Sequence, residues 1–200
     1  MSPRTKEQFE EIRETRREQI MNAALELFAQ EGYTNCSISR LASHAGISKG
    51  LMYNYFESKE ALLMAIIEDG MSDFINYFDP NHKGILEADE LAGFIRKTFS
   101  NIRENQKFWT LYINIVLQPR VREYLHGEPF NNLMNQYGPM LMKYFTKMGY
   151  EDPELEMLTF SALLEGFGVL MVYAYPGFEF SDGLLQKYEN RVIGLFTRKP

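Results

Sequence analysis

Residues 37–67 read SISRLASHAGISKGLMYNYFESKEALLMAII and contain the signals that decide the fold. Apolar residues recur at helical spacing over 38–45, and Gly46 follows as a stop signal, which predicts a first short helix. Ser48 is placed to cap a second short helix over 49–56. Because isolated helices of about eight residues are unstable, these two must be held by packing against neighbouring helices.

Longer helices are predicted on both sides of this pair. Before it, a polar arm at 1–15 leads into apolar residues at helical spacing over 20–28, and Gly32 follows as a stop signal. After it, Ser58 can cap a helix that runs over 59–78. The rest of the chain shows helical periodicity and almost no period-two alternation, so the predicted fold class is all-α.

The two short helices and the glycine-containing turn between them predict a helix-turn-helix, which presents its second helix to the major groove of DNA. Met52 and Phe56 lie one turn apart on the inward face of that helix. The residues on its outward face are Gly50, Tyr53 and Asn54. Glycine inside a helix costs about 1 kcal/mol relative to alanine, which close approach of the backbone to base edges would offset. A tolerated surface glycine is the alternative.

Two lysines allow a DNA-binding interpretation and an ordinary one. Lys49, in the exposed first turn of the second short helix, could donate to guanine or be a solvated surface residue. Lys59 opposes the dipole at the start of its helix unless an anion lies nearby, either a DNA phosphate or the neighbouring Glu57 or Glu60. The formal net charge of the chain is −6, so any nucleic-acid binding must be local.

Residues 41–62, LASHAGISKGLMYNYFESKEAL, resemble the N-terminal DNA-binding domain of TetR-type transcriptional regulators. That family's pattern runs I-A-x-x-A-G-V-S-x-G-x-L-Y-x-[HY]-F and continues to x-S-K-E-x-L. The preceding F-x-x-x-G-[YF] element of the family corresponds to residues 28–33. The resemblance covers roughly residues 16–68. Four residues are mild departures from the pattern: Cys36, Ser37, Ile47 and Met52.

The resemblance implies contacts with double-stranded DNA at nine positions. Those that commonly meet bases are Ser39, Lys49, Gly50 and Leu51. Those that commonly meet phosphates are Thr34, Ser37, Tyr53, Tyr55 and Lys59. Thr34 and Ser37 are equally placed to cap the first short helix. A two-fold homodimer would place paired recognition helices about one duplex turn apart, on a near-palindromic operator.

The expected domains are the arm at 1–15, the DNA-binding domain at 16–60, and a helical effector-binding and dimerisation domain at 61–200. A helix that begins at Pro153, after the Asp152 cap, is apolar on two opposite sides. One stripe comprises Leu155, Leu158, Ala162, Gly166, Val169 and Tyr173, and the other Met157, Phe160, Leu164, Phe167 and Met171. A later helix offers Leu184, Leu185, Tyr188, Val192 and Leu195. These faces predict a four-helix dimer seam, with burial inside one chain as the alternative.

The middle of the chain is rich in aromatic residues, most of which must be core. Pro119 and Pro139 are expected to interrupt helices and open space between them, with Asn114, Gln118 or Gln136 as polar neighbours of a small hydrophobic or amphipathic effector. TetR-type proteins usually bind their inducers in such a region. The candidate pocket residues are Phe94, Phe99, Trp109, Tyr112, Asn114, Met134, Tyr137, Phe160, Phe167 and Met171.

A calcium site is the competing interpretation of residues 79–90, which follow much of the pattern of an EF-hand loop. Residues at the required offsets are Asp79, Asn81, Gly84, Glu87 and Glu90. Lys83, however, stands where an oxygen ligand is required, and the chain has no second copy of the loop. A connecting loop of turn residues followed by an acidic helix start explains the same residues.

Enzymatic activity, cofactors and metals are not expected. The three histidines, His44, His82 and His126, are scattered, and Cys36 has no obvious partner base. A single cysteine, the charged first twenty residues and the lack of a long uncharged apolar run predict a soluble cytoplasmic protein. The sequence therefore predicts a ligand-responsive transcription regulator. Repression is the expectation, activation remains open, and the operator, effector and target genes are not readable.

Overall fold

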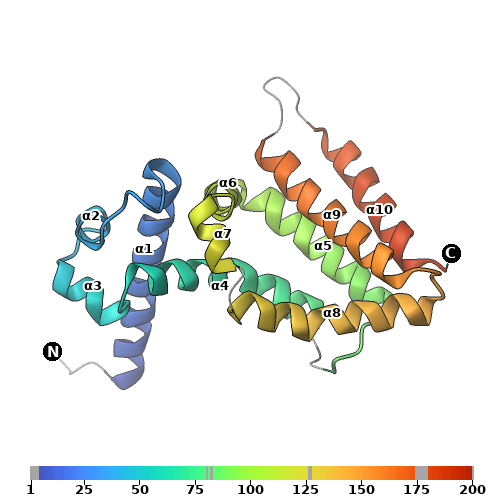
Figure 1. Cartoon of the computed structure of the whole chain (residues 1–200), viewed down its shortest axis with the longest axis horizontal. Coiled ribbons are helices and arrows are strands. Elements are labelled where there is room, and N and C mark those ends of the chain that lie inside the picture. The colour runs from blue at the N-terminus through green and yellow to red at the C-terminus, as the bar shows by residue number, and fades with distance from the viewer. Residues whose placement is uncertain (1–4, 80, 82, 126–127, 174–179, 200) are drawn as a thin grey trace. The chain divides into compact units, whose positions relative to one another are not determined.

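The computed structural model describes residues 5–79, 81, 83–125, 128–173 and 180–199, and only the backbone of residues 72–76, 128–134 and 136. In these ranges all regular secondary structure is helical, as predicted (Figure 1). The chain divides into two compact units. The N-terminal unit comprises Met1–Gly70 with Asn114–Arg122, and the C-terminal unit comprises Met71–Ile113 with Glu123–Pro200. A short segment from the middle of the sequence thus belongs to the N-terminal unit.

The N-terminal unit is built on α1 (Lys6–Glu31), α2 (Ile38–His44), α3 (Lys49–Tyr55) and the start of α4 (Lys59–Phe78). Helix α2 packs against both α1 and α3. The side chains that fill the core of this unit are Ile20, Leu27, Phe28, Leu41, Met52, Leu62 and Leu63. The predicted caps are confirmed, since Ser37, Ser48 and Ser58 each accept a hydrogen bond from a backbone N–H of the helix that follows.

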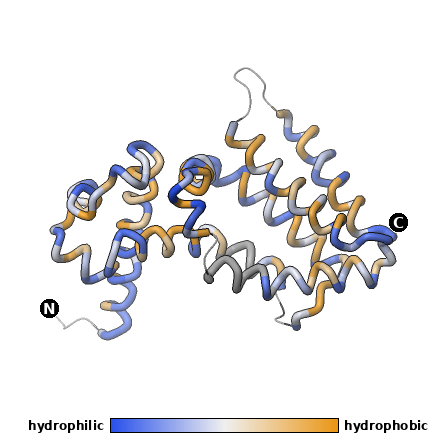
Figure 2. Tube along the Cα trace, viewed as in Figure 1, coloured by the Kyte–Doolittle hydropathy of each residue, from blue (hydrophilic) through white to orange (hydrophobic). Residues whose placement is uncertain are grey.

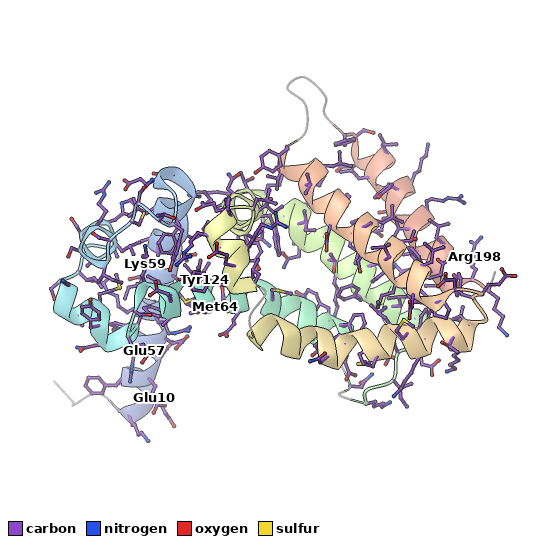
Figure 3. The ribbon with its side chains drawn as sticks, in the orientation of Figure 1. Glu10, Glu57, Lys59, Met64, Tyr124 and Arg198 are labelled. Atoms are coloured by element: carbon purple, nitrogen blue, oxygen red, sulfur yellow. The ribbon has the colours of Figure 1, made fainter. Side chains whose placement is uncertain are left out.

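The polar stretch predicted at 1–15 is helical from Lys6 onward, because α1 begins there. Thr5 and Gln8 form a capping box there, in which Thr5 Oγ1 accepts from the N–H of Gln8 at 3.3 Å and Gln8 Oε1 accepts from the N–H of Thr5 at 3.0 Å. The side chains before Ile20 are mostly exposed, and Figure 3 shows Glu10 on this stretch. A helix without a buried face leaves no apolar period, so the sequence pattern could not reveal it.

The C-terminal unit contains the rest of α4 and most of the later helices, which Figure 1 shows in green to red. These are α5 (Ala88–Glu104), most of α6 (Gln106–Val116), the end of α7 (Pro119–Leu125), α8 (Glu128–Met148), α9 (Pro153–Val172) and α10 (Asp182–Thr197). Helix α5 packs against α9 and α10, and α8 packs against α9. The predicted start of α9 is confirmed, since Asp152 Oδ1 accepts from the N–H of Leu155 at 3.0 Å.

The two prolines expected to break helices behave differently. Pro119 begins α7, so it separates α6 from α7 as predicted. Pro139 lies inside α8, which runs through it without a break, so the expected interruption there is wrong. Proline removes one helical hydrogen bond and crowds the preceding turn. Burial of Tyr144 and Phe145 on the following turns favours continuing α8 and offsets that cost.

Candidate nucleic-acid interface

Helix α3 has one buried side and one solvent-exposed side, which we call the bare side. Met52 is fully buried, and Phe56, directly after the helix, lies beneath the guanidinium of Arg17 at 5.4 Å from its ring centroid. The Arg17–Phe56 contact links the end of α3 to α1, and α3 itself packs against α2. The opposite side leaves Leu51 38% exposed and Tyr53 48% exposed. The other exposed residues of α3 are Lys49, Gly50 and Asn54, so all the predicted outward residues lie at the surface.

Gly50 has no structural reason within the chain to be glycine. A Cβ built on it would meet nothing within 4 Å, and its φ is not positive. By contrast, Gly46 in the turn before α3 has a φ of 66°, a conformation that other residues adopt only with strain. The roughly 1 kcal/mol cost of a helical glycine at position 50 is therefore not offset by internal packing. This observation fits both interpretations of Gly50, close approach to a partner and a tolerated surface glycine.

Helix α2 brings a second set of predicted residues to the surface. Thr34, Ser37 and Ser39 are exposed. Ser37 is committed to capping, since its Oγ accepts from the N–H of Arg40 at 3.2 Å. A serine hydroxyl can still donate while it accepts, so the cap leaves its proton available for a phosphate oxygen.

An ion pair fixes α2 on the end of α1. Arg40 Nη2 lies 2.5 Å from Glu31 Oε1, and Arg40 Nε lies 3.5 Å from the other carboxylate oxygen. The hydrogen bond from Arg40 lowers the pKa of Glu31 below its usual value. The pair is solvent-exposed, so it orients α2 more than it stabilises the unit. The guanidinium of Arg40 is therefore paired within the chain. Arg40 was not among the predicted DNA contacts.

Lys59 has an internal role that the sequence did not reveal. Its ammonium donates to the carbonyls of Tyr33 at 2.9 Å and Cys36 at 3.0 Å, and it lies 4.2 Å from the centroid of the Tyr33 ring. Figure 3 labels this side chain. The ammonium thus binds two carbonyl oxygens, and it also interacts electrostatically with Glu60, one of the two expected neighbouring carboxylates. One N–H of the ammonium remains for the phosphate contact implied by the resemblance.

Asn54 is the residue of α3 that the predicted contact set omitted. It is exposed and lies one helical turn after Gly50, on the same side of α3. Asparagine can pair with adenine through two hydrogen bonds in the major groove. Its spacing of four residues from Gly50 was the sequence signal that could have added Asn54 to the predicted contacts. Tyr55, which was in the predicted set, is only half-exposed.

The single cysteine is not placed for chemistry. Cys36 is buried, and its thiol lies 3.7 Å from the carbonyl oxygen of Leu27. Burial raises the pKa of this thiol, which keeps it protonated and unreactive. His44 lies 4.0 Å from Glu26, while His82 and His126 fall outside the described residues. No group of three or more His, Cys, Asp or Glu that could hold a metal occurs among the described residues.

The loop that resembled a calcium site is closed by its own hydrogen bonds. Asp79 Oδ1 accepts from the N–H of Lys83 at 3.0 Å, and Asp79 Oδ2 accepts from the N–H of Gly84 at 3.1 Å. Glu87 and Glu90 form a capping box at the start of α5. These carboxylates therefore act as turn and capping groups. The calcium interpretation gains no support, and the connecting-loop interpretation explains the residues.

Several of the predicted pocket residues are paired by ring contacts. Ring contacts join Phe99 with Phe167 at 3.9 Å between centroids, Phe94 with Phe160 at 6.3 Å, and Trp109 with Tyr112 at 5.4 Å. These six are buried in the C-terminal unit, and Tyr137 and Met171 are half-buried. The side chains of Met134 and Gln136 lie outside the described residues. Asn114 and Gln118 belong to the N-terminal unit, and their role as polar neighbours of an effector stays a prediction.

The two predicted stripes of α9 differ in burial. Phe160 and Phe167 of one stripe are buried. Exposed residues of the other stripe are Leu155, Leu158, Ala162, Val169 and Tyr173, and α10 adds exposed Leu184 and Leu195. We call these seven residues the apolar face, and Figure 2 shows hydrophobic segments along both helices. By length and composition α9 could also cross a membrane, but it carries an exposed glutamate, Glu165.

Comparison with known proteins supports the assignment of the N-terminal unit. Residues 20–66 match the family model of bacterial regulatory proteins of the tetR family. The fatty acid metabolism regulator protein of Bacillus subtilis (strain 168) is 32% identical over 116 residues, which cover 54% of this chain and 60% of the relative. The chain spans less than two thirds of the length of this relative and of a second one from the same bacterium.

Solved structures share the fold over most of the chain. The transcriptional regulator FadR from Bacillus subtilis in complex with stearoyl-CoA matches with a TM-score of 0.63 and 22% identity, over 91% of this chain and 98% of that chain. AibR in complex with isovaleryl coenzyme A and operator DNA matches with a TM-score of 0.66 and 19% identity, over 92% and 99%. Residues 20–66 thus match the model of the tetR family of bacterial regulatory proteins, and the solved structures show that most of the chain shares the fold of these transcription regulators.

Proposed function

We propose that this protein is a cytoplasmic transcription repressor that binds a near-palindromic operator as a homodimer. The observation that carries the proposal is the bare side of α3. There Lys49, Tyr53 and Asn54 surround Gly50, at which the described part of the chain would leave room for a side chain. A helix of this kind suits the major groove, because the missing side chain lets the backbone approach base edges. Hydrogen-bond donors on either side of Gly50 can then reach bases and phosphates.

The apolar face supports a second copy as the partner of α9 and α10. Leu158 is 65% exposed and Leu184 is 47% exposed, a large cost for side chains left in water. The same face on a second chain would cover them in a symmetric interface. A membrane is a poorer partner, because the carboxylate of Glu165 in the middle of α9 would enter hydrocarbon at a cost of a few kcal/mol.

Selection of bound duplexes from a random DNA pool tests this function. We expect an enriched motif with two inverted half-sites about one duplex turn apart. Affinity for it should fall steeply as salt rises, since each neutralised phosphate releases counterions. Failure to enrich any duplex, or enrichment of motifs without a two-fold repeat, would contradict the proposal.

The effector we propose is an acyl thioester of coenzyme A. Two TetR-type structures that share this fold hold stearoyl-CoA and isovaleryl coenzyme A. The interior of the C-terminal unit is apolar, with the paired rings of Phe99 and Phe167 on α5 and α9. Next to Phe99, the hydroxyl of Thr98 is buried, and it has no hydrogen-bond partner among the described residues. An unpaired buried hydroxyl costs about 1–3 kcal/mol, and a thioester carbonyl reaching it would remove that cost.

Release of the selected operator provides the test of the effector. The operator complex, followed by fluorescence anisotropy, should dissociate when stearoyl-CoA or isovaleryl-CoA is added and should persist with coenzyme A alone. A full switch from 99:1 to 1:99 requires about 5.5 kcal/mol of differential affinity. Thr98→Val should weaken the response to the acyl thioester without changing operator affinity in its absence. An unchanged complex with both thioesters would contradict this effector class.

A further inference from the structure

Tyr33, in the turn between α1 and α2, is held by groups from three parts of the chain. Its N–H donates to Gln118 Oε1 at 2.8 Å, and its carbonyl accepts from Lys59 Nζ at 2.9 Å. Its hydroxyl donates to Glu60 Oε1 at 3.0 Å, and its ring packs edge-on against Phe28 at 5.2 Å between centroids. Tyr33 is only 2% exposed. This turn leads directly into α2, so whatever holds Tyr33 also positions the helix-turn-helix.

Gln118 closes the C-terminal end of α1 with both ends of its carboxamide. The oxygen accepts from Tyr33, and the nitrogen donates to the carbonyl of Phe28 at 3.1 Å and to that of Asn114 at 3.3 Å. The carbonyl of Phe28 already accepts from the N–H of Gly32 at 3.1 Å, so the Gln118 amide adds a second donor to it. Only an amide of this length supplies an acceptor and a donor at once. A glutamate could still accept from Tyr33 but could not donate to Phe28.

The position of Gln118 in the chain gives this cap a further consequence. It lies in Asn114–Arg122, a segment of the N-terminal unit whose two ends continue into the C-terminal unit at Ile113 and Glu123. Lys59 and Glu60, which hold the other side of Tyr33, begin α4, which also continues into the C-terminal unit at Met71. Tyr33 is therefore held by residues of both segments through which the chain continues from the N-terminal unit into the C-terminal unit: α4 and Asn114–Arg122. We call the contacts of Gln118 with Phe28 and Tyr33 the Gln118 clamp.

We infer that Gln118 is a positioning residue for operator reading. The clamp fixes the helix-turn-helix on the segment that joins it to the C-terminal unit, and so sets the spacing at which a dimer accepts two half-sites. This inference rests on the dimeric operator binding proposed above. A cap with no positioning role would lower stability and weaken binding to every operator by the same factor. The clamp instead predicts an effect that depends on half-site spacing.

The experiment measures affinity as a function of spacing. Operators from the selection above are remade with one base pair added or removed between half-sites, which rotates them by about a tenth of a duplex turn. The wild type should lose affinity sharply at both altered spacings. In Gln118→Ala that loss should shrink by roughly 5-fold or more, the size of a typical coupling between sites. The loss caused by a base change within one half-site should stay as in the wild type.

Two further variants keep the test decisive. Leu117→Ala removes an exposed side chain beside Gln118 and should keep the wild-type spacing profile. Gln118→Glu retains the bond from Tyr33 and should show a smaller shift, which provides a measurement if the alanine variant does not fold. A wild-type spacing profile in folded Gln118 variants would overturn the clamp and leave the proposed function intact. If no operator is enriched at all, the proposed function fails first and the clamp fails with it.

Discussion

The bare side of α3 and the apolar face of α9 and α10 are both exposed, but they leave different chemistry uncovered. On α3 the exposed side chains around Gly50 are mainly polar, with Leu51 as the apolar exception, and no described atom lies within 4 Å of a Cβ built on Gly50. On α9 and α10 they are mainly leucines and other apolar residues such as Leu158. A hydrated groove of base edges and phosphates complements the first surface, whereas only another apolar surface complements the second. Each surface therefore indicates its own class of partner.

The largest expected effect follows from placing a charge on the apolar face. Leu158→Glu should weaken self-association by about 2–4 kcal/mol, because a carboxylate would be buried at the centre of the seam. Sedimentation should then show monomers, and operator affinity should fall by roughly 100-fold or more as the second half-site is lost. Ile85→Glu alters a comparably exposed apolar residue outside α9 and α10 and is the control. Unchanged dimers in Leu158→Glu would rule out this face as the seam.

Lys59 separates internal support from DNA contact within the N-terminal unit. Lys59→Met keeps the aliphatic stem but removes the bonds to Tyr33 and Cys36, and should cost about 1.5–3 kcal/mol in the free energy of unfolding. Lys49→Met is the matched control, since Lys49 is exposed, and it should leave that free energy unchanged. Chemical denaturation measures both. Equal stability of the two variants would mean that the Lys59 bonds contribute little and that phosphate contact is its main role.

Lys49 tests whether α3 reads bases. Lys49→Ala should cost about 1–3 kcal/mol in operator binding and relax the preference at one base pair, because a donor to guanine is lost. Affinities for operators that carry each of the four base pairs at that position provide the measurement. A uniform loss over all four would assign Lys49 to phosphate instead.

Tyr53 should show the opposite pattern with a smaller size. The family resemblance implies that its hydroxyl contacts phosphate, so Tyr53→Phe should cost about 0.5–1.5 kcal/mol in binding free energy for every duplex, specific or not. The slope of affinity with salt should change little, since no charge is removed. If Tyr53→Phe changes the order of affinities among operator sequences, Tyr53 contacts a base and its assignment to phosphate is wrong.

Helices α2 and α3 could be predicted because their signals lie within a few residues. The contacts that hold them in place join residues far apart in the sequence and could not be predicted. Ser48 and Gly46 fix the start of α3 and the turn before it through contacts within a few residues, so the sequence pattern was sufficient. The bond from Tyr33 to Gln118 spans 85 residues, and that from Lys59 to Tyr33 spans 26. No periodicity reports such pairs. Pro139 shows the same limit, because a proline normally breaks a helix unless packing elsewhere outweighs it.

Gly50→Ala tests the central claim, that α3 is shaped for a groove of DNA, more directly than any other change. Nothing in the chain lies where the added methyl group would be. The account therefore predicts effects of opposite sign: the free energy of unfolding rises by up to about 1 kcal/mol, while operator affinity falls at least tenfold as the methyl group blocks close approach. A variant that binds the operator as tightly as the wild type would contradict the account.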